Sequence, residues 1–361
     1  MSRDIRRLLM ALLSLAASDA LGWTGLDSRD GGFPEPNVVY HRMAMDLAQL
    51  SPGMKVHLAV ACPKARYFSV SVYDQRSGSS LAFATDREIT GATDLARPAC
   101  VPGREVGLTL VPAASGGGRR ELVVPALAGR EGILEIWFRA YLGEDVEPPE
   151  VSLIAPDGRE AGRPVGAPVH VFSKGMRLLE AARQAKRLPP ESEGDKMIIA
   201  PTDGSGWFPN GHPYLFARLD ATNPLVRRRF KRLPLLGGER FAVVRFKSPR
   251  ARYWSVCMYD APSSTLLRDK DGAGACVNDS GAKTAADGTV TVVLASPEAA
   301  ARARAMGADA LPVYYPRRVV AMPLMLFRII PNGPASRDEL PALEGRFYPV
   351  ESLESVVKGG P

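Results

Sequence analysis

The chain has 361 residues, of which 24% are charged and 45% are hydrophobic, and its formal net charge is +7. This composition excludes a disordered chain, because such chains have too few hydrophobic residues to form a core. The basic run at residues 227–232 has few aromatic neighbours, so it indicates a solvated loop, and we expect no nucleic-acid partner. The length suits two domains of about 150 residues each.

Residues 1–22 have the features of a secretory signal peptide. Basic Arg3, Arg6 and Arg7 precede an apolar run at residues 8–17, and small residues follow at 20–22. The apolar run is too short to span a membrane, and no later stretch is apolar enough, so we expect no transmembrane segment. The pattern predicts an exported protein, periplasmic or secreted. The alternative is an amphipathic helix at the start of a cytosolic protein.

The ten-residue segment ARYFSVSVYD at residues 65–74 recurs in similar form as ARYWSVCMYD at residues 251–260. Three shorter echoes keep the same order in the chain, namely Phe33-Pro34 with Phe208-Pro209, Ala99-Cys100-Val101 with Ala275-Cys276-Val277, and Phe138-Arg139 with Phe327-Arg328. An internal repeat of this kind predicts two copies of one structural unit. We expect the copies at residues 23–156 and 206–361, with a connector at 157–205 that contains a helix at 174–187.

Within each copy, the patterning predicts strands. Short runs rich in Val, Leu, Ile and aromatic residues end at Gly, Pro or Asp. The expected strands are 55–61, 66–73, 106–111 and 133–142 in the first copy, and 240–246, 252–259, 289–294 and 319–330 in the second. An Ala-rich insertion at 296–310 predicts a helix. The fold class is therefore mainly β, with two tandem antiparallel β-sandwich or jelly-roll-like units related by pseudo-two-fold symmetry.

The four cysteines fall two to a copy, with Cys62 and Cys100 in the first and Cys257 and Cys276 in the second. In an exported protein this distribution predicts one disulfide in each unit. Four free buried thiols are the alternative for a protein that is not exported. The spacing fits no zinc motif, so we expect no metal site.

Side chains alternate along a strand, so the repeated segment separates into two faces. One face places apolar residues between Arg66 and Asp74 in the first copy and between Arg252 and Asp260 in the second. The apolar residues predict a core face. The four charged residues then lie at the rims of the sandwich, where we expect each to have a structural partner.

The other face carries tyrosines, Tyr67 and Tyr73 in the first copy and Tyr253 and Tyr259 in the second. The closing strand of each copy adds further candidates for a ligand site if it lies alongside, namely Trp137 and Arg139 in the first copy and Arg328 in the second. The first of these strands also carries Glu135 and Tyr141. Aromatic rings with a few polar groups suit a small apolar or sugar-like ligand. They suit equally an interface between the two repeats, where Tyr and Trp are enriched.

The chain contains none of the common catalytic motifs. It has no phosphate-binding loop, no dinucleotide fingerprint and no nucleophile elbow, and its four histidines are scattered. We expect no cofactor, and the sequence identifies no catalytic residue. The favoured function is a non-catalytic module that binds a small molecule or a partner. The alternatives are a metal-independent enzyme that uses Tyr, Arg and Asp, and a structural envelope protein; the oligomeric state stays open.

The repeated motif resembles that of a bacterial family, the domain of unknown function 1214, which is often found beside domain 1254. The match rests on Arg66-Tyr67-Phe68-Ser69 with Tyr73-Asp74, and on Arg252-Tyr253-Trp254-Ser255 with Tyr259-Asp260. The resemblance implies a β-sandwich of jelly-roll type, often in exported proteins, and brings no established activity. The chain departs from the family in its Ala-rich insertion and in lacking a Gly-Asp-containing middle segment.

Overall fold

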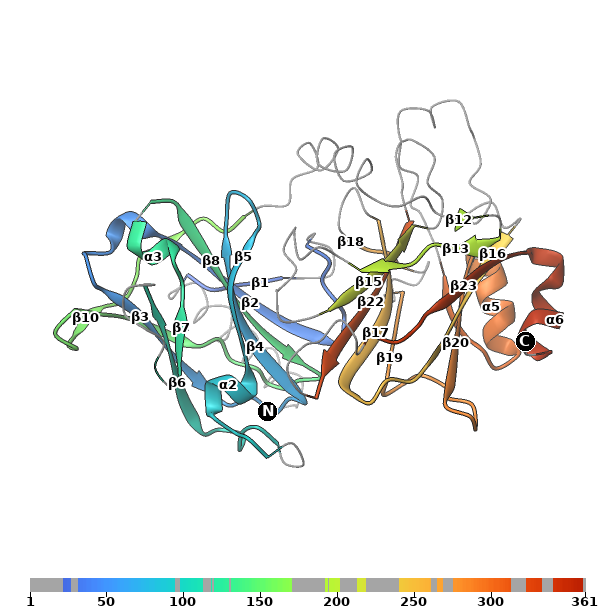
Figure 1. Cartoon of the computed structure of the whole chain (residues 1–361), viewed down its shortest axis with the longest axis horizontal. Helices are drawn as coiled ribbons and strands as arrows, with labels where there is room; N and C mark the ends of the chain where they lie inside the picture. Colours follow the sequence, from blue (N-terminus) through green and yellow to red (C-terminus); the bar gives the residue numbers. More distant parts are fainter. Residues whose placement is uncertain are drawn as a thin grey trace, which may run out of the picture. The chain divides into compact units, whose positions relative to one another are not determined.

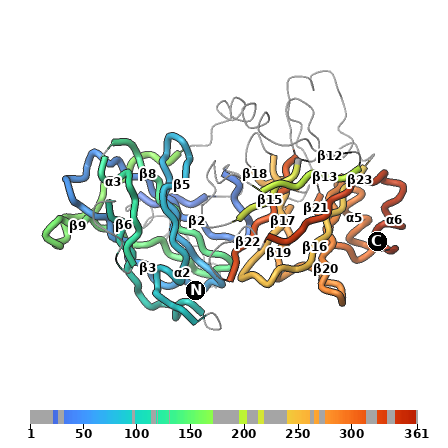
Figure 2. Tube along the Cα trace, viewed as in Figure 1, coloured from blue at the N-terminus to red at the C-terminus, as the bar shows by residue number. Residues whose placement is uncertain are grey.

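The structure is a computed structural model with two compact units (Figures 1 and 2). It describes residues 22–26, 32–94, 98–112, 118, 120–129, 131–170, 192–193, 195–201, 213–218, 240–260, 265–268, 275–312, 323–332 and 340–359. Of these, residues 22–26 and 37–170 belong to unit 1, and residues 32–36 join those from 192 onward in unit 2. The expected signal peptide, apart from Gly22, and the expected helix at 174–187 lie outside the described residues.

Unit 1 contains two sheets. The first has the order β1 (Thr24–Gly25), β2 (Val38–Asp46), β8 (Ile133–Tyr141), β4 (Tyr67–Asp74) and β5 (Ser80–Thr85), with β11 (Gly166–Ala167) also on β2. The second has the order β10 (Glu160–Gly162), β9 (Glu150–Ile154), β3 (Lys55–Ala61), β6 (Glu105–Val111) and β7 (Glu121–Val123). The short helices are η1 (Leu47–Gln49), α2 (Asp86–Thr90) and α3 (Ala126–Gly129).

Unit 2 also contains two sheets. The first has the order β14 (Ala200–Pro201), β15 (Tyr214–Arg218), β22 (Pro323–Pro331), β17 (Ala251–Asp260) and β18 (Thr265–Leu266), with β19 (Cys276–Asn278) on β17. The second has the order β12 (Ser192–Glu193), β13 (Lys196–Met197), β23 (Glu344–Pro349), β16 (Arg240–Lys247), β20 (Thr289–Ala295) and β21 (Asp309–Pro312). The helices are α5 (Pro297–Ala305), η5 (Val350–Ser352) and α6 (Leu353–Lys358).

The two units share one order of strand pairing. The series β2-β8-β4-β5 in unit 1 corresponds to β15-β22-β17-β18 in unit 2, and β9-β3-β6-β7 corresponds to β23-β16-β20-β21. All these pairs are antiparallel except the last of each second series, which is parallel in both units. The prediction of a mainly β, antiparallel fold is confirmed.

The core of each unit lies between its two sheets. In unit 1 the inner face of β4 places Phe68, Val70 and Val72 against apolar side chains from β3 and β6. The matching residues of β17 are Trp254, Val256 and Met258, and they are buried in the core of unit 2. Full burial of each such side chain stabilises the fold by about 1.5–3 kcal/mol. The alternation therefore gives the correct core face in both copies of the motif.

Unit 2 covers the second face of its β16 sheet with helices, as Figure 1 shows. Phe241 and Val243 of β16 pack against Ala300 of α5 and Leu353 of α6. β16 is accordingly apolar on both faces, whereas β3 of unit 1 alternates apolar residues with Lys55 and His57. α5 begins where the sequence predicts, since Ser296 accepts a hydrogen bond from the Ala299 amide and Pro297 occupies the first turn.

All four cysteines form disulfides. Cys62 pairs with Cys100 in unit 1, and Cys257 pairs with Cys276 in unit 2, with Cα–Cα distances of 5.9 and 4.1 Å. The prediction of one disulfide in each unit is confirmed. Among the helices that the structure describes, none has the length and hydropathy needed to cross a membrane.

Candidate functional site

Each unit carries a buried set of tyrosine, serine and arginine side chains on the outer face of its first sheet, which we call the Tyr–Arg face. In unit 2 the pairing register sets Arg328 of β22 between Ser255 of β17 and Tyr214 of β15. The flanking Tyr253 and Tyr259 project to the same side because successive side chains of a strand alternate. All five side chains are at most 3% exposed. The face is therefore shielded from water.

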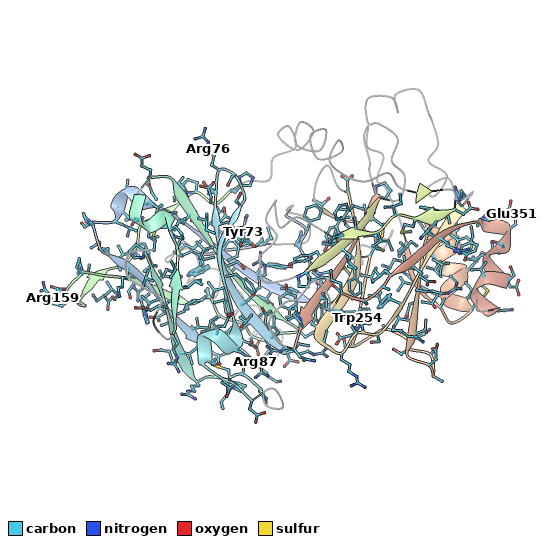
Figure 3. All side chains as sticks on the ribbon, viewed as in Figure 1. Tyr73, Arg76, Arg87, Arg159, Trp254 and Glu351 are labelled. Atoms are coloured by element: carbon cyan, nitrogen blue, oxygen red, sulfur yellow. A yellow bond between two sulfur atoms is a disulfide. The ribbon has the colours of Figure 1, made fainter. Side chains whose placement is uncertain are left out.

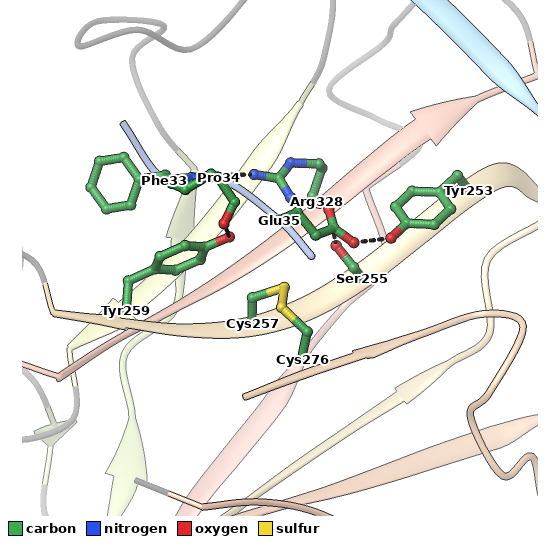
Figure 4. Close-up of a disulfide and its surroundings, with 9 residues drawn as sticks. All are labelled: Phe33, Pro34, Glu35, Tyr253, Ser255, Cys257, Tyr259, Cys276 and Arg328. Atoms are coloured by element: carbon green, nitrogen blue, oxygen red, sulfur yellow. Dashed lines mark hydrogen bonds and ion pairs between the residues drawn. A yellow bond between two sulfur atoms is a disulfide. The ribbon is translucent and has the colours of Figure 1, made fainter. Parts of the chain in front are cut away.

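In unit 2 this face holds the carboxylate of Glu35 (Figure 4). The Tyr253 hydroxyl donates to Glu35 Oε1, and the Ser255 hydroxyl donates to Oε2 at 3.0 Å. The Arg328 guanidinium forms an ion pair with Oε2 and donates a further hydrogen bond to the Phe33 carbonyl at 3.1 Å. Three donors thus converge on one carboxylate, which is the arrangement that compensates a buried charge.

The residues before Glu35 complete the contact. The Tyr259 hydroxyl donates to the Pro34 carbonyl at 3.1 Å, and the Phe33 ring meets the Tyr259 ring edge-on at 5.3 Å. Phe33 has a φ of 56°, a left-handed conformation that is strained for a bulky residue. Strain of this kind persists only where the surrounding contacts determine the conformation.

The electrostatics of Glu35 are dominated by its burial. Loss of water raises the pKa of the Glu35 carboxyl above its ordinary value. The Arg328 charge and the Ser255 hydroxyl act in the opposite direction, and the nearby Asp279 carboxylate adds to the increase. The side chain of Arg328 also lies over the Tyr214 ring at 5.5 Å.

Unit 1 repeats the same five positions. Arg139 of β8 lies between Ser69 of β4 and Tyr40 of β2, and Tyr67 and Tyr73 flank Ser69 as Tyr253 and Tyr259 flank Ser255. These five side chains are at most 5% exposed. Figure 3 shows Tyr73 among the strands of unit 1, whereas Arg76, in the turn after β4, extends outward.

The hydrogen bonds of Arg139 differ from those of Arg328. Arg139 Nη1 donates to Ser71 Oγ at 2.5 Å, and Nη2 donates to the Tyr73 hydroxyl at 2.8 Å. Ser71 has the register position that Cys257 occupies in unit 2. The Ser69 hydroxyl is fully buried and has no hydrogen-bond partner among the residues that the structure describes.

Next to its Tyr–Arg face, unit 1 buries a carboxylate of its own, that of Glu135 on β8. Trp137 Nε1 donates to Glu135 Oε1 at 2.9 Å, and Arg42 forms an ion pair with the same oxygen at 3.4 Å. The His170 amide and the Gln75 side chain donate to Oε2 at 3.0 and 3.4 Å. Burial raises the pKa of Glu135, and these donors offset only part of the increase.

Trp137 links the Glu135 cluster to the Tyr–Arg face of unit 1. The guanidinium groups of Arg139 and Arg42 lie 4.7 and 5.8 Å from the centre of the Trp137 ring. Such cation–π contacts favour both cations, and the effect is larger where water is excluded. The Glu135 cluster and the Tyr–Arg face of unit 1 are therefore in contact through Trp137, and both are buried.

The structure brings together the candidates on the tyrosine-bearing face and separates those at the rims. Tyr67, Tyr73, Trp137 and Arg139 lie in one cluster of unit 1, and Tyr253, Tyr259 and Arg328 lie in one cluster of unit 2. Arg66 and Asp74 lie at the two ends of β4, and Arg252 and Asp260 lie near the two ends of β17. Asp74 accepts two hydrogen bonds from Ser77 in the turn after β4, Arg66 is exposed, Arg252 is half-buried and Asp260 is buried.

Sequence reasoning missed Glu35, Tyr40, Arg42 and Tyr214, and it noted Glu135 only as a charged group on the strand beside the tyrosine-bearing face. The repeated Phe33-Pro34 was a signal for the segment that carries Glu35, but it did not reveal the partner. Among the described residues no group of three His, Cys, Asp or Glu side chains is placed to hold a metal ion. His57 is hydrogen-bonded to Thr109 and His41 to the Val146 carbonyl.

The comparisons with known proteins agree with this geometry on the fold and bring no function. Residues 231–314 match the model of a family described as "Protein of unknown function (DUF1214)", which confirms the resemblance over the second copy of the motif. No curated protein matches the chain.

One solved structure extends the comparison to both units, and a second was also found. An uncharacterised protein from Burkholderia cenocepacia aligns with a TM-score of 0.59 at 14% identity, over 94% of this chain and 86% of its own. A protein from Vibrio parahaemolyticus aligns with a TM-score of 0.49 at 13% identity, over 88% of this chain and 90% of its own. The first likeness shows the fold alone.

Proposed function

We propose that this protein is an exported, non-catalytic binding module, and that the Tyr–Arg face of unit 1 binds its ligand through a carboxylate. The observation that carries the proposal is the buried carboxylate of Glu35 on the matching face of unit 2. The same three residue types stand at the same register in unit 1, namely Tyr67, Ser69 and Arg139. Groups of the same kind at the same spacing favour the same chemical partner. One disulfide in each unit supports export.

The Ser69 hydroxyl supports a ligand at this position. A buried hydroxyl without a partner costs about 1–3 kcal/mol, because it has lost its hydrogen bonds to water. Ser69 is such a group, whereas the hydroxyl of its counterpart Ser255 donates a hydrogen bond to a carboxylate oxygen of Glu35. A ligand that offers an acceptor to Ser69 recovers this energy. The same acceptor carries the charge that Arg139 favours.

The surroundings of the face indicate the rest of the ligand. Tyr40, Tyr73 and Trp137 present rings around the Arg139 guanidinium, all within 6 Å of it. Rings with a few directed polar groups are typical of sites for small, largely apolar molecules. We therefore expect an organic acid with an apolar or sugar-like body.

A second candidate function, a metal-independent enzyme, is favoured by Glu135. A buried carboxyl with a raised pKa is a common general acid. However, the four groups around Glu135 all donate hydrogen bonds to it, so its two carboxylate oxygens are already engaged by Arg42, Trp137, His170 and Gln75. This makes Glu135 a better anchor for Arg42 and Trp137 than an acid, and binding remains the first proposal.

Native mass spectrometry of the mature protein, purified from the exported fraction of its own host, tests the proposal. We expect an organic acid to be retained at one molecule per chain, and denaturing analysis then gives its mass. Ser69→Ala should reduce retention at least tenfold, since it removes one hydrogen bond to a charged group. The matched control is Ser255→Ala, which changes the same position in unit 2 and should retain the ligand.

Two results would overturn the proposal. One is an empty protein whose melting temperature does not rise with millimolar aliphatic or aromatic carboxylates, since a specific ligand stabilises the folded state by mass action. The other is a retained molecule without a carboxylate, or one that Ser69→Ala and Ser255→Ala release equally. Turnover of a retained acid that Glu135→Gln abolishes would favour the enzyme.

A further inference from the structure

Residues 33–35, which we call the strap, are held on unit 2 by contacts of an unusual kind. No strand pairing of the described residues includes the strap, and Pro34 has no amide hydrogen to donate. The strap is fixed instead by side chains of unit 2, which bind one carboxylate, two carbonyl oxygens and one ring. By contrast, β11 of unit 1 is attached to β2 by a backbone ladder.

The contacts that hold the strap define a chemical pattern. Arg328 and Tyr259 bind the carbonyls of Phe33 and Pro34, which any extended peptide offers. The Tyr259 ring meets the aromatic side chain, and the carboxylate of Glu35 enters the set of three donors. The pattern is aromatic, proline, acidic. Every one of these groups can come from another polypeptide as well as from this chain.

Two features limit how strongly the strap itself is held. Phe33 has a strained backbone with a φ of 56°. The Glu35 carboxylate is buried, so part of its ion pair with Arg328 offsets lost hydration. A segment in trans that binds the same groups without the strained Phe33 conformation avoids that part of the cost, although the strap has the advantage of being part of the same chain.

We propose that the Tyr–Arg face of unit 2 is a docking site for an extended partner segment with an aromatic–proline–acidic pattern, and that the strap is its resident competitor. This site is separate from the ligand site proposed for unit 1. A partner that docks here releases residues 33–35 from unit 2. These residues precede β2 in the chain.

The test uses a fluorescent, end-blocked peptide Gly-Phe-Pro-Glu-Pro-Asn, which copies residues 32–37, and the full mature chain. Glu35→Ala removes the carboxylate of the resident strap. We expect fluorescence anisotropy to show binding to Glu35→Ala at least tenfold tighter than to the wild type. A peptide with Gln in place of Glu should bind at least tenfold more weakly, because it loses a hydrogen bond between charged groups.

Further variants keep the test decisive. Glu35→Gln preserves the shape of the strap and should give intermediate peptide affinity, so it replaces Glu35→Ala if that variant fails to fold. Adding Ser255→Ala to either variant should weaken peptide binding, and adding Ser69→Ala should not. If the protein retains no ligand in unit 1 but unit 2 still binds the peptide, only the proposed function is rejected and the docking site stands.

Hydrogen exchange of the wild type provides a second readout. Saturating peptide should increase exchange at the amides of Phe33 and Glu35, since docking in trans displaces the strap. The proposal fails if folded Glu35→Gln does not bind the peptide at millimolar concentration. It also fails if the Glu and Gln peptides bind equally, or if binding leaves exchange in the strap unchanged.

Discussion

The two Tyr–Arg faces share their centre and differ in their flank. The centre consists of three tyrosines, a serine and an arginine in both units. The flanking positions on neighbouring strands differ in polarity. Unit 1 has Arg42, Ser71, Glu135 and Trp137 where unit 2 has Phe216, Cys257, Leu324 and Leu326. Unit 2 adds a carboxylate from the strap, whereas unit 1 builds a carboxylate into its own sheet.

This difference separates what the fold requires from what one unit adds. In unit 2, apolar side chains fill most of these flanking positions in the corresponding sheet, so the fold does not require polar residues there. Unit 1 instead buries the ion pair of Glu135 and Arg42, which at most breaks even with an apolar replacement of similar volume. Stability alone does not explain the charged flank of unit 1. A role in binding, as we propose for this face, gives a reason for it.

The largest expected effect is the loss of the Glu35–Arg328 ion pair in unit 2. Arg328→Met leaves a buried carboxylate without its counter-charge and should reduce the free energy of unfolding by about 3–5 kcal/mol at neutral pH. The measurement is urea-induced unfolding. The control is Glu35→Gln with Arg328→Met, which removes both charges and should regain most of the loss. A single variant within about 1 kcal/mol of wild type would show that the pair is already solvated.

Removing the disulfides should have the next largest effect, and it compares the units directly. Cys257 lies on the Tyr–Arg face of unit 2 at the position of Ser71, so replacing it by Ser together with Cys276 makes the two faces more alike. Loop closure of 19 residues predicts a loss of about 3 kcal/mol, and closure of 38 residues by Cys62 and Cys100 predicts about 4 kcal/mol. Thermal unfolding of both double-serine variants gives the comparison. Equal melting temperatures for wild type and variants would contradict it.

The fold could be predicted from the sequence because its signals are local. Phe68, Val70 and Val72 alternate with polar residues, and the same alternation returns near Trp254, so the core face follows from a period of two. The insertion helix was predictable for the same reason, with Ser296 and Pro297 at its start and alanines behind them.

The sequence indicated the tyrosines and arginines of the two sites but not the carboxylates beside them, because those residues are distant in the chain or carry no local signal. Tyr253 and Arg328 stand in recognisable strands, but Glu35 is 218 residues from Tyr253 and lies in no regular element. Glu135 occupies an alternate position of an apolar strand, where nothing local indicates that Arg42 stands near it across β2 and β8. Strand register, which sets Tyr40 and Tyr214 beside the two arginines, is a property of the folded sheet.

The two serines of the shared centre provide a smaller and sharper comparison. Ser255→Ala removes a hydrogen bond to the buried Glu35 carboxylate and should cost about 1–3 kcal/mol. Ser69→Ala removes a hydroxyl that has no partner, so the protein without ligand should change by less than about 0.5 kcal/mol or become more stable. Denaturant unfolding of the ligand-free variants measures both. Equal losses would mean that Ser69 already has an acceptor in the free protein.

The smallest expected effect is the pH dependence that Glu35 gives to unit 2. The groups that face its carboxyl are Arg328, Tyr253 and Ser255, with Asp279 nearby. Burial raises the pKa of Glu35 in the folded protein, so the folded state binds a proton more tightly than the unfolded state. The stabilisation by this proton is complete below the ordinary carboxyl pKa and is lost as the pH rises through the folded value.

Glu35→Gln isolates this contribution because it removes the titrating group and leaves Glu135, whose pKa burial also raises. The difference in unfolding free energy between wild type and Glu35→Gln should shift in favour of wild type as the pH falls toward the ordinary carboxyl value. Its slope is limited to about 1.4 kcal/mol per pH unit, the value for one proton. A slope of opposite sign would mean that Arg328 and the hydroxyls outweigh burial. The stabilisation of the strap would then be complete above the ordinary carboxyl pKa and lost as the pH falls below it, so acid would release the strap for exchange with a partner segment.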